Sequence, residues 1–533
     1  MGMGWRVERL GCKHAPIIEL APPKSICVHT VSFKSPTRLL YMTTLQDDCK
    51  PAAHPLRAAL ERYGLFTPHQ AATRRWSIGC VSLEVTQRCN LDCSLCYLSE
   101  HSEAVQDFPL EEIYRRIDMI ADRYGKDCDV QVSGGDPTLR DHGELELIVR
   151  RIVQRGMRAS LFTNGILASR VLLARLCNAG LTDVAFHVDM TQERKGYANE
   201  TALNAIRLEY IDRARGLGLS VFFNTTIYDA NVADVPMLVR FFAEHSDVVR
   251  LASFQMQADT GRGLLGARPG ALTQARMMAL IEQGAQTPLN WDALLGGHPH
   301  CNRYATALVL GRGTQAKGTQ AKGTQAKGTQ AEGTQAEGTQ VKMYDLFEDG
   351  AFIARAMRET AHVSVPRRSA WRAAWVFAAA VAVRPSLAVA GAAWLVRLLW
   401  RLRADLPLLG QAAPRKISYF IHNFMDAKDL DPERIDSCVF MAAGPQGMVP
   451  MCEFNARRDE FLLRPLTMAG GGTWEPLRKD NAVLFKANAQ GLVHYPIKYL
   501  KGRSRQHAMV QRKHHAPDFA VTQTQPVTAN NQN

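Results

Sequence analysis

The chain lacks the unbroken apolar run near its start that forms a secretory signal. Its first 20 residues mix charged side chains with short apolar pieces instead. We therefore expect a cytoplasmic protein. Its twelve cysteines should then stay reduced and available to metals, because disulfides form mainly in exported proteins.

The sequence also lacks an apolar run that could cross a membrane as one simple helix. Residues 366–403 are the most hydrophobic stretch, but Arg384 and Pro385 divide them into two pieces. Each piece has roughly half of the ~20 apolar residues that a spanning helix needs. Seven arginines and four tryptophans in this stretch favour helices that lie in the headgroup layer of an anionic membrane. A pair of buried core helices remains the alternative.

The composition is that of a globular protein, with 46% hydrophobic and 22% charged residues. A chain of 533 residues is too long for one ordinary core, so we expect more than one domain. The formal charge of +13 suits an anionic partner. Because arginines are concentrated in residues 366–403, we expect that partner to be the inner face of a membrane rather than nucleic acid.

From Val81 onwards, short apolar runs rich in β-branched residues alternate with longer amphipathic segments. The expected strands are residues 81–85, 130–133, 160–163, 184–188, 221–225 and 248–254. The expected helices include residues 110–123, 145–154, 169–178, 202–215 and 235–244. This alternation predicts an α/β fold with a partial TIM-like (βα)6 barrel, and an open doubly wound sheet remains the alternative.

Composition also suggests where the chain divides. The segments are a poorly defined N-terminal extension (1–75), the core barrel (76–265), the start of a C-terminal region (266–312), a GTQAK repeat (313–342), a connector (343–365), hydrophobic helices rich in Arg and Trp (366–410), a region with two further cysteines (411–470) and a tail (471–533). The polar, glycine-containing repeat cannot bury a core, so we expect a disordered insertion. Without it, the runs ATALVL and MYDLF would be neighbours.

The main chemical motif is CxxxCxxC, formed by Cys89, Cys93 and Cys96 directly after the first expected strand. Three thiolates can hold three corners of a cubic four-iron cluster, which leaves one iron open to an exchangeable ligand. A zinc site and a ferredoxin-type electron carrier are the alternatives. Structural zinc usually needs four ligands in paired motifs, and a closed cluster needs a fourth cysteine. Neither is present nearby.

This segment, with Tyr97 directly after the last cysteine, resembles the radical S-adenosylmethionine (radical SAM) enzymes. The resemblance implies that Cys89, Cys93 and Cys96 hold a catalytic 4Fe-4S cluster and that Tyr97 lies at the cofactor. In this family, S-adenosylmethionine chelates the open iron, and an electron from the cluster releases a 5'-deoxyadenosyl radical. An external reductant such as flavodoxin or ferredoxin would supply the electron.

A second motif follows the next expected strand, where Gly134 and Gly135 precede Asp136 and Pro137. Glycines at a strand end let the backbone come close to a ligand, and their carbonyl groups can accept hydrogen bonds from an ammonium group. Radical SAM proteins characteristically have a GGEP-like turn here, and GGDP is a mild departure. We therefore expect these four residues to bind the cofactor.

Three further polar residues lie at or near the ends of later expected strands: Asn164, Asp189 and Asn224. Ligand contacts in an α/β barrel are concentrated at such ends. We expect these side chains to contact the ribose, the adenine or the substrate. The alternative is that each one only caps a turn or helix.

After the barrel, Cys301 follows an HPH sequence, and Cys438 and Cys452 flank a glycine-containing turn. Together with the run FMDAKDLDPER, these elements resemble radical SAM proteins related to archaeal tetraether lipid synthase, some of them pterin methyltransferase-like. The resemblance implies an auxiliary iron-sulfur cluster on these three cysteines in a C-terminal domain. Three cysteines leave one ligand position of such a cluster unfilled, and His298 is a candidate for it. The alternative is that His298 only stabilises a local turn. This chain has fewer cysteines than the cysteine-rich members of that group.

These features predict a radical SAM enzyme that modifies an unactivated carbon of a hydrophobic, lipid substrate, by carbon-carbon coupling or methylation. A lipid substrate would also explain residues 366–403. One alternative is a peptide-modifying radical enzyme with an auxiliary cluster. The other is a non-catalytic iron-sulfur protein for electron transfer or sensing, which would not need GGDP.

Overall fold

The computed structural model describes residues 55–62, 66–67, 76–99, 101–262, 272–293, 296–311, 341–360, 363, 370–410 and 412–477. All of them belong to one compact unit, residues 53–533. Most of the N-terminal extension, nearly all of the GTQAK repeat and the tail from residue 478 lie outside the described residues, so the expectations for them stay predictions.

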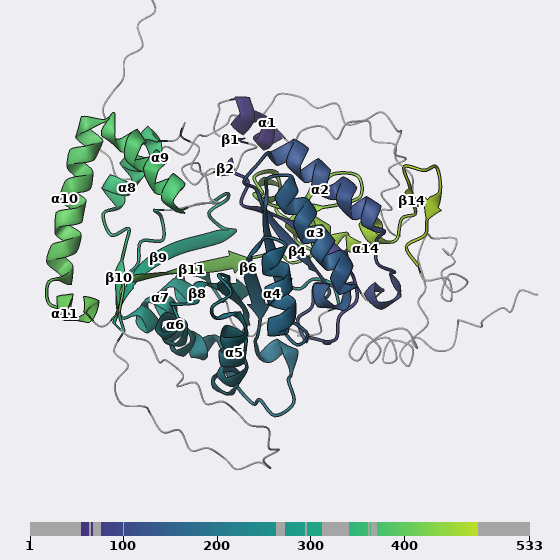
Figure 1. Ribbon diagram of the computed structural model, residues 1–533, viewed down its shortest axis with the longest axis horizontal. Coiled ribbons are helices and arrows are strands. Elements are labelled where there is room, and N and C mark those ends of the chain that lie inside the picture. The colour runs from purple at the N-terminus through teal and green to yellow at the C-terminus, as the bar shows by residue number, and fades with distance from the viewer. Residues whose placement is uncertain are drawn as a thin grey trace, which may run out of the picture. The chain divides into compact units, whose positions relative to one another are not determined.

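The centre of the structure is a sheet that contains all six expected strands (Figure 1). They are β3 (Cys80–Thr86), β4 (Asp129–Gly134), β5 (Arg158–Thr163), β6 (Leu181–His187), β7 (Ser220–Ile227) and β8 (Val249–Met256), and each pairs in parallel with the next. Their residues are mostly buried. Burial on both faces of a parallel sheet explains why these strands have nearly continuous apolar sequences.

The five expected helices are also present. They are α2 (Leu110–Tyr124), α3 (His142–Gln154), α4 (Arg170–Asn178), α5 (Glu200–Ala214) and α6 (Val235–Glu244), and Figure 1 shows them packed along the sheet. Two of them begin earlier than expected because of their caps. Asp141 accepts hydrogen bonds from the first-turn amides of α3, and Asn199 does the same for α5.

Two strands from the C-terminal part of the chain extend this parallel sheet on both sides. β11 (Arg415–Asn423) lies beside β8, and β12 (Phe440–Ala443) lies beside β3. The antiparallel strands β9 (Asn302–Leu310), β10 (Lys342–Asp345) and β13 (Met448–Pro450) complete an eleven-stranded sheet within the described residues. Residues 411–470 thus share the sheet of the barrel, and a separate auxiliary domain is not confirmed.

The two ends of the parallel array come close together in space. The ring of Phe440 at the start of β12 lies 6.2 Å from the ring of Phe424, just after β11, and 6.3 Å from that of His422. The sheet therefore curves strongly, as expected when strands tilt and twist towards a barrel. This curvature brings the chain after β11 next to the start of β12.

The strands on either side of the repeat pair with each other, as their sequences predict. Leu310 at the end of β9 lies opposite Lys342 at the start of β10 in an antiparallel ladder. The end of β9 and the start of β10, which flank the repeat, therefore lie side by side.

Residues 370–410 form α9 (Ala370–Ala382), α10 (Pro385–Leu402) and α11 (Leu406–Leu409), next to α8 (Gly350–Glu359). The break falls at Arg384, as expected, because Pro385 suits the first turn of a helix but not its interior. Among the described residues, none of the helices has both the length and the apolar character needed to traverse a bilayer.

The remaining elements are short or peripheral. They are α1 (Pro55–Arg62), β1 (Phe66–Thr67), β2 (Trp76–Ser77), α7 (Gln274–Ala285), α12 (Pro432–Asp436), α13 (Met451–Ala456), α14 (Arg458–Leu462), β14 (Leu466–Thr467) and β15 (Thr473–Trp474). Of these, α12 to α14 contribute residues to the two cysteine groups or to the barrel interior.

Candidate functional site

The three cysteines of the CxxxCxxC motif lie on the loop after β3, at the carboxyl end of the parallel strands. Burial raises the pKa of the Cys93 thiol well above its usual value, and the negative charges of Cys96, Asp189 and Cys89 raise it further. Arg262 acts in the opposite direction. These thiols are thus close enough to repel one another as thiolates, and a bound cationic centre would relieve that repulsion.

No three His, Cys, Asp or Glu side chains within the described ranges converge tightly enough to hold one metal ion. A four-iron cluster does not require such convergence, because each thiolate binds a different iron atom at one corner of the cube. The cysteine loop therefore fits a cluster by its donor type, its spacing and the mutual influence of its thiols.

The two glycines of the GGDP turn are required by close packing against the cysteine loop. A Cβ atom on Gly134 would lie 2.0 Å from the carbonyl oxygen of Thr86, and one on Gly135 would lie 2.1 Å from that of Arg88. Gly134 also has a φ of +129°, which side chains disfavour. The turn is thus held directly against the segment that leads into Cys89.

Tyr97 links the loop to the same turn. Its hydroxyl group donates a hydrogen bond of 2.5 Å to the carbonyl oxygen of Gly134. The Arg458 guanidinium lies 4.7 Å from the centre of the Tyr97 ring. The expected carbonyl acceptor for the cofactor therefore already has one donor from the chain, and a carbonyl oxygen can accept a second.

Asp136 has an internal role in the structure. Its buried carboxylate accepts hydrogen bonds from the Thr138 amide (3.0 Å), the Thr163 hydroxyl (2.8 Å) and the Asn164 amide (2.8 Å). It thus joins the ends of β4 and β5. Pro137 begins the short 3-10 helix that follows. The expected cofactor contact of these two residues stays a prediction.

Asn164 lies beside the cluster cysteines. Its side-chain amide donates a 2.6 Å hydrogen bond to the Asn90 side chain, and its nitrogen lies 3.8 Å from the sulfur of Cys89. This position favours an interaction with a cysteine sulfur, in addition to the ribose or adenine contact expected from its strand end.

Asp189 is fully buried and pairs with His187, which the sequence analysis did not identify. The Asp189 carboxylate lies 2.6 Å from the His187 ring and accepts hydrogen bonds from the amides of Thr191 and Thr226. Burial alone would raise the pKa of Asp189, but the charge and hydrogen bonds of these partners lower it to about 2. Asn224 lies in register with His187 on the neighbouring strand.

Arg262 is the second residue that the sequence analysis missed. It follows β8 in the run TGRG, and its side chain is only 1% exposed. Its guanidinium lies 3.9 Å from Asp92 and 3.5 Å from Glu103. Burial alone would lower the pKa of Arg262, but the nearby Cys96, Glu103 and Asp92 raise it. A buried arginine is uncommon, so composition gives no reason to expect one here. The only sequence signal for Arg262 was its position after the last strand of the barrel.

The structure also brings the C-terminal cysteines together. Burial raises the pKa of the Cys438 thiol to about 12, with smaller contributions from Cys452 and Cys301. Burial likewise raises the pKa of Cys452, and Cys301 adds to that effect. The Arg434 side chain lies 3.3 Å from the sulfur of Cys301. All three thiols therefore lie where the chain after β11 meets the start of β12.

His298 lies near this second group. Its ring is 3.7 Å from the carboxylate of Glu433, and its carbonyl oxygen accepts a hydrogen bond from the Cys301 amide. Burial lowers the pKa of His298, which favours the neutral ring that metals bind. The role of His298 as a cluster ligand stays a prediction.

Residues 83–242 match the family model described as the radical SAM superfamily. This part of the chain belongs to that superfamily of enzymes, whose cofactors are a 4Fe-4S cluster and S-adenosylmethionine. The matched range contains β4 to β7, most of β3, the cysteine loop and the GGDP turn.

Two curated relatives each match about a third of the chain. The 7,8-dihydro-6-hydroxymethylpterin dimethyltransferase of Methanocaldococcus jannaschii is 29% identical over 187 residues, which cover 34% of this chain and 37% of the relative. The Fe-coproporphyrin III synthase of Methanosarcina barkeri is 31% identical over 183 residues, which cover 34% and 44%. The chain thus spans less than half the length of each relative.

Among solved structures, Streptococcus suis SuiB bound to the precursor peptide SuiA is 13% identical and has a TM-score of 0.33. The match covers 43% of this chain and 49% of SuiB. A likeness at this level carries no argument about substrate.

Proposed function

We propose that the protein cleaves S-adenosylmethionine reductively and uses the resulting radical to modify an unactivated carbon of a hydrophobic, lipid substrate. The observation that supports the cleavage of S-adenosylmethionine is the packing of the GGDP turn against the loop of Cys89, Cys93 and Cys96. When bound, the cluster and S-adenosylmethionine supply the electron transfer and the hydrogen-abstracting radical. An external reductant such as flavodoxin or ferredoxin supplies the electron.

The chain's own residues position these cofactors. Cys89, Cys93 and Cys96 hold three iron atoms, while the Gly134 and Gly135 backbone offers polar groups at the edge of the loop. Asn164 and Arg262 donate towards the cysteine sulfurs and orient them, as second-layer groups do in metal sites. His187 and Asp189 lie at the carboxyl ends of the strands, where substrate or ribose hydroxyl groups would enter.

We propose a lipid substrate, with carbon-carbon coupling or methylation as the outcome, because the chain carries arginine- and tryptophan-rich helices beside the barrel. A lipid at the inner face of an anionic membrane would be accessible to a cytoplasmic protein that binds that surface. The relatives' names include pterin, porphyrin, nucleotide and peptide chemistries. The substrate class therefore rests on this chain's own residues and on the resemblance of its C-terminal motifs.

We propose an auxiliary iron-sulfur cluster at Cys301, Cys438 and Cys452, with His298 as the candidate fourth ligand. Cys452 and Cys301 both raise the pKa of Cys438, and Cys301 raises that of Cys452, which supports the assignment. The cationic Arg434 beside Cys301 would stabilise the negative charge of such a cluster.

Anaerobic reconstitution tests both clusters. Two four-iron clusters predict about eight iron atoms per chain, and replacing Cys89, Cys93 and Cys96 with Ala should leave about four and abolish 5'-deoxyadenosine formation. Replacing Cys301, Cys438 and Cys452 with Ala should also leave about four iron atoms per chain, but this variant should retain some cleavage of S-adenosylmethionine. Cys177→Ala, in α4, is the control. A wild-type protein that binds iron but forms no 5'-deoxyadenosine would contradict the radical reaction and favour an electron carrier.

The lipid substrate is tested by untargeted lipid analysis of a strain that lacks the protein. We expect one class of lipid to disappear and its unmodified precursor to accumulate. Restoration by the wild type but not by the Cys89, Cys93 and Cys96 variant would link the change to the barrel. An unchanged lipid profile, with a modified peptide missing instead, would favour the peptide-modifying alternative.

A further inference from the structure

Helix α10 has apolar side chains on two opposite faces. Its inner face includes Leu387 and Leu402, which are buried, and Trp394, whose ring stacks 5.9 Å from that of Phe352 on α8. A surface helix that packs by one face normally has charged or polar residues on the other. In α10 the other face is also apolar.

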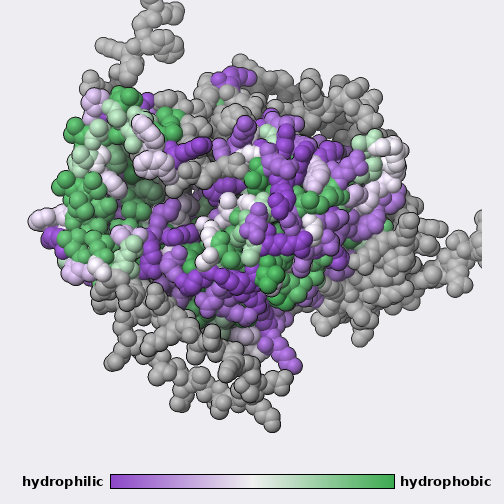
Figure 2. Space-filling model, in the orientation of Figure 1, coloured by the Kyte–Doolittle hydropathy of each residue, from purple (hydrophilic) through white to green (hydrophobic). Residues whose placement is uncertain are grey.

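The open face runs along the helix at helical spacing. It carries Val389, Val396, Leu399 and Trp400, with exposed fractions of 71%, 66%, 51% and 66%. Positions separated by three, four or seven residues lie on the same side of a helix, so these side chains form one stripe. Figure 2 shows the corresponding strip of hydrophobic surface over α10, beside barrel helices that are mostly hydrophilic.

Helix α9 continues this pattern. Trp371 and Trp375 are one helical turn apart, and their exposed fractions are 76% and 60%. Contiguous exposed apolar surface of this kind marks an interaction site rather than ordinary surface.

The charges around the stripe identify its partner. Residues 370–404 contain five arginines and no acidic residue. Arg403 at the end of the stripe places its guanidinium 4.1 Å from the centre of the Trp400 ring. Arginine beside tryptophan, with apolar side chains on the same face, is typical of helices in the headgroup layer of an anionic bilayer. A protein partner or a second copy would not need this excess of positive charge.

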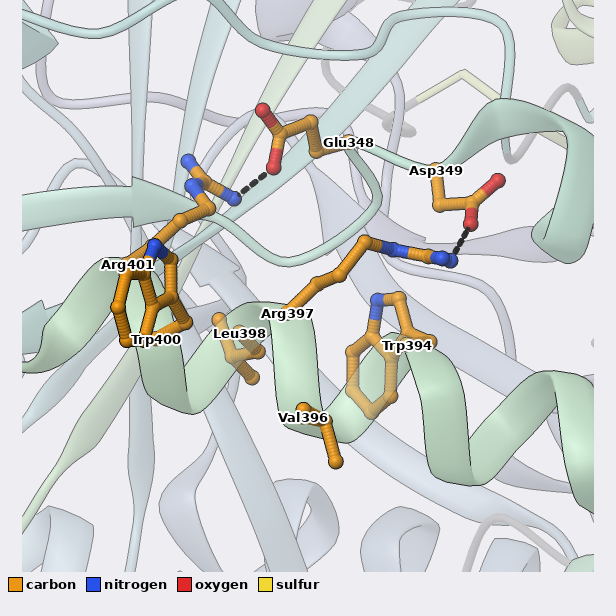
Figure 3. A pocket seen from close by; sticks show the side chains of 8 residues that line it. All are labelled: Glu348, Asp349, Trp394, Val396, Arg397, Leu398, Trp400 and Arg401. Atoms are coloured by element: carbon orange, nitrogen blue, oxygen red, sulfur yellow. Dashed lines mark hydrogen bonds and ion pairs between the residues drawn. The ribbon is translucent and has the colours of Figure 1, made fainter.

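Two of the five arginines form ion pairs with the loop before α8. Arg397 pairs with Asp349, and Arg401 pairs with Glu348 (Figure 3). These pairs line a cavity of about 550 Å³ together with Trp394 and other α10 residues. They attach the helix to the loop before α8, beside the face that packs inward through Leu387, Trp394 and Leu402.

We infer that the open face of α9 and α10 docks the protein on an anionic lipid bilayer, with both helices lying flat in the headgroup layer. The inference deepens the proposed function, since it rests on a substrate that lies in a membrane. Its test needs no radical chemistry, so the two can fail separately.

The test is co-sedimentation of the purified full chain with vesicles of phosphatidylcholine alone or mixed with phosphatidylglycerol. We expect binding to the mixed vesicles and a weakening by salt. The open-face variant Trp375→Ser/Val396→Ser/Trp400→Ser should bind at least about tenfold more weakly. The control Leu147→Ser/Val171→Ser, which changes exposed apolar residues on α3 and α4, should bind like the wild type.

Charge is tested with Arg372→Gln/Arg403→Gln, which should remove most of the preference for phosphatidylglycerol. Equal unfolding temperatures show that each variant is folded. The inference is overturned if the wild type ignores the mixed vesicles or if the open-face variant binds them as well as the control. Self-association that only the open-face variant loses, without vesicle binding, would assign the face to a second copy.

Discussion

Arg458, on α14, forms two hydrogen bonds of 2.7 Å with the carboxylate of Glu84, on β3. Both side chains are almost completely buried. The pair joins the C-terminal part of the chain to the first strand of the barrel, and the same guanidinium covers the ring of Tyr97 after the cysteine loop. The site in the barrel is therefore completed by residues far along the sequence.

Arg458→Gln should destabilise the protein strongly, because it leaves the Glu84 charge buried without its cationic partner. Loss of one partner of a buried pair typically costs about 3–5 kcal/mol. Chemical unfolding of the full chain should show this as a lower denaturant midpoint. Arg457→Gln is the matched control, since the neighbouring side chain is half exposed and its ion pairs are on the surface. Similar midpoints for the two variants would contradict a structural role of the buried pair.

Gly134→Ala should disrupt the cysteine loop, because the new methyl group would overlap the Thr86 carbonyl oxygen. We expect a loss of stability of ~4 kcal/mol or more, and less iron per chain after anaerobic reconstitution. Gly196→Ala is the control. It also has a positive φ, but there is no atom within 4 Å of an added Cβ. An equal iron content in both variants would show that the close packing is dispensable.

Arg262→Gln should make the cluster harder to reduce, because a buried cation beside Cys96 stabilises the extra electron. Groups that support metal ligands typically contribute about 10-fold or more to activity, so we expect a comparable loss in 5'-deoxyadenosine formation. An electron paramagnetic resonance titration should show a more negative reduction potential. Arg262→Lys, which keeps the charge, should restore part of it. A potential that is unchanged in Arg262→Gln would limit this residue to a packing role.

His187 should make stability depend on pH. Burial alone would lower the pKa of His187, but the nearby Asp189 charge outweighs burial and raises it above 6.5. A group whose pKa is higher in the folded state stabilises the protein. This stabilisation is fully present below the pKa of the unfolded state and is lost as the pH rises through the pKa of the folded state. The wild type should therefore lose its stability advantage over His187→Gln between pH ~6.5 and the raised value. Unfolding temperatures of both proteins across this range test it, and a constant difference would contradict it.

Much of the barrel was predictable from local sequence. The six strands and five helices match expectation because their signals are local. Runs of β-branched residues favour buried strands, and apolar residues at helical spacing favour helices that pack by one face. The division of residues 366–403 was predictable because Pro385 cannot sit inside a helix. The pairing of β9 with β10 was also visible, since the repeat interrupts two compatible apolar runs.

The roles of individual site residues were less predictable. The position of Asp136 predicts a cofactor contact but gives no sign that its carboxylate accepts hydrogen bonds from its own turn and from the end of β5. His187 and Arg262 belong to no recognised motif, and their importance depends on their positions beside Asp189 and Cys96. Hydrogen-bond partners separated by tens of residues leave no local pattern in a sequence.

The sequence by itself determined the three-thiol loop, because its three cysteines lie within eight consecutive residues. Only the tertiary structure decided that β11 and β12 join the barrel sheet, since strand pairing depends on long-range register and curvature. It also decided which face of α10 stays open. Both faces are apolar in sequence, and the structure packs the one with Leu387, Trp394 and Leu402 inward.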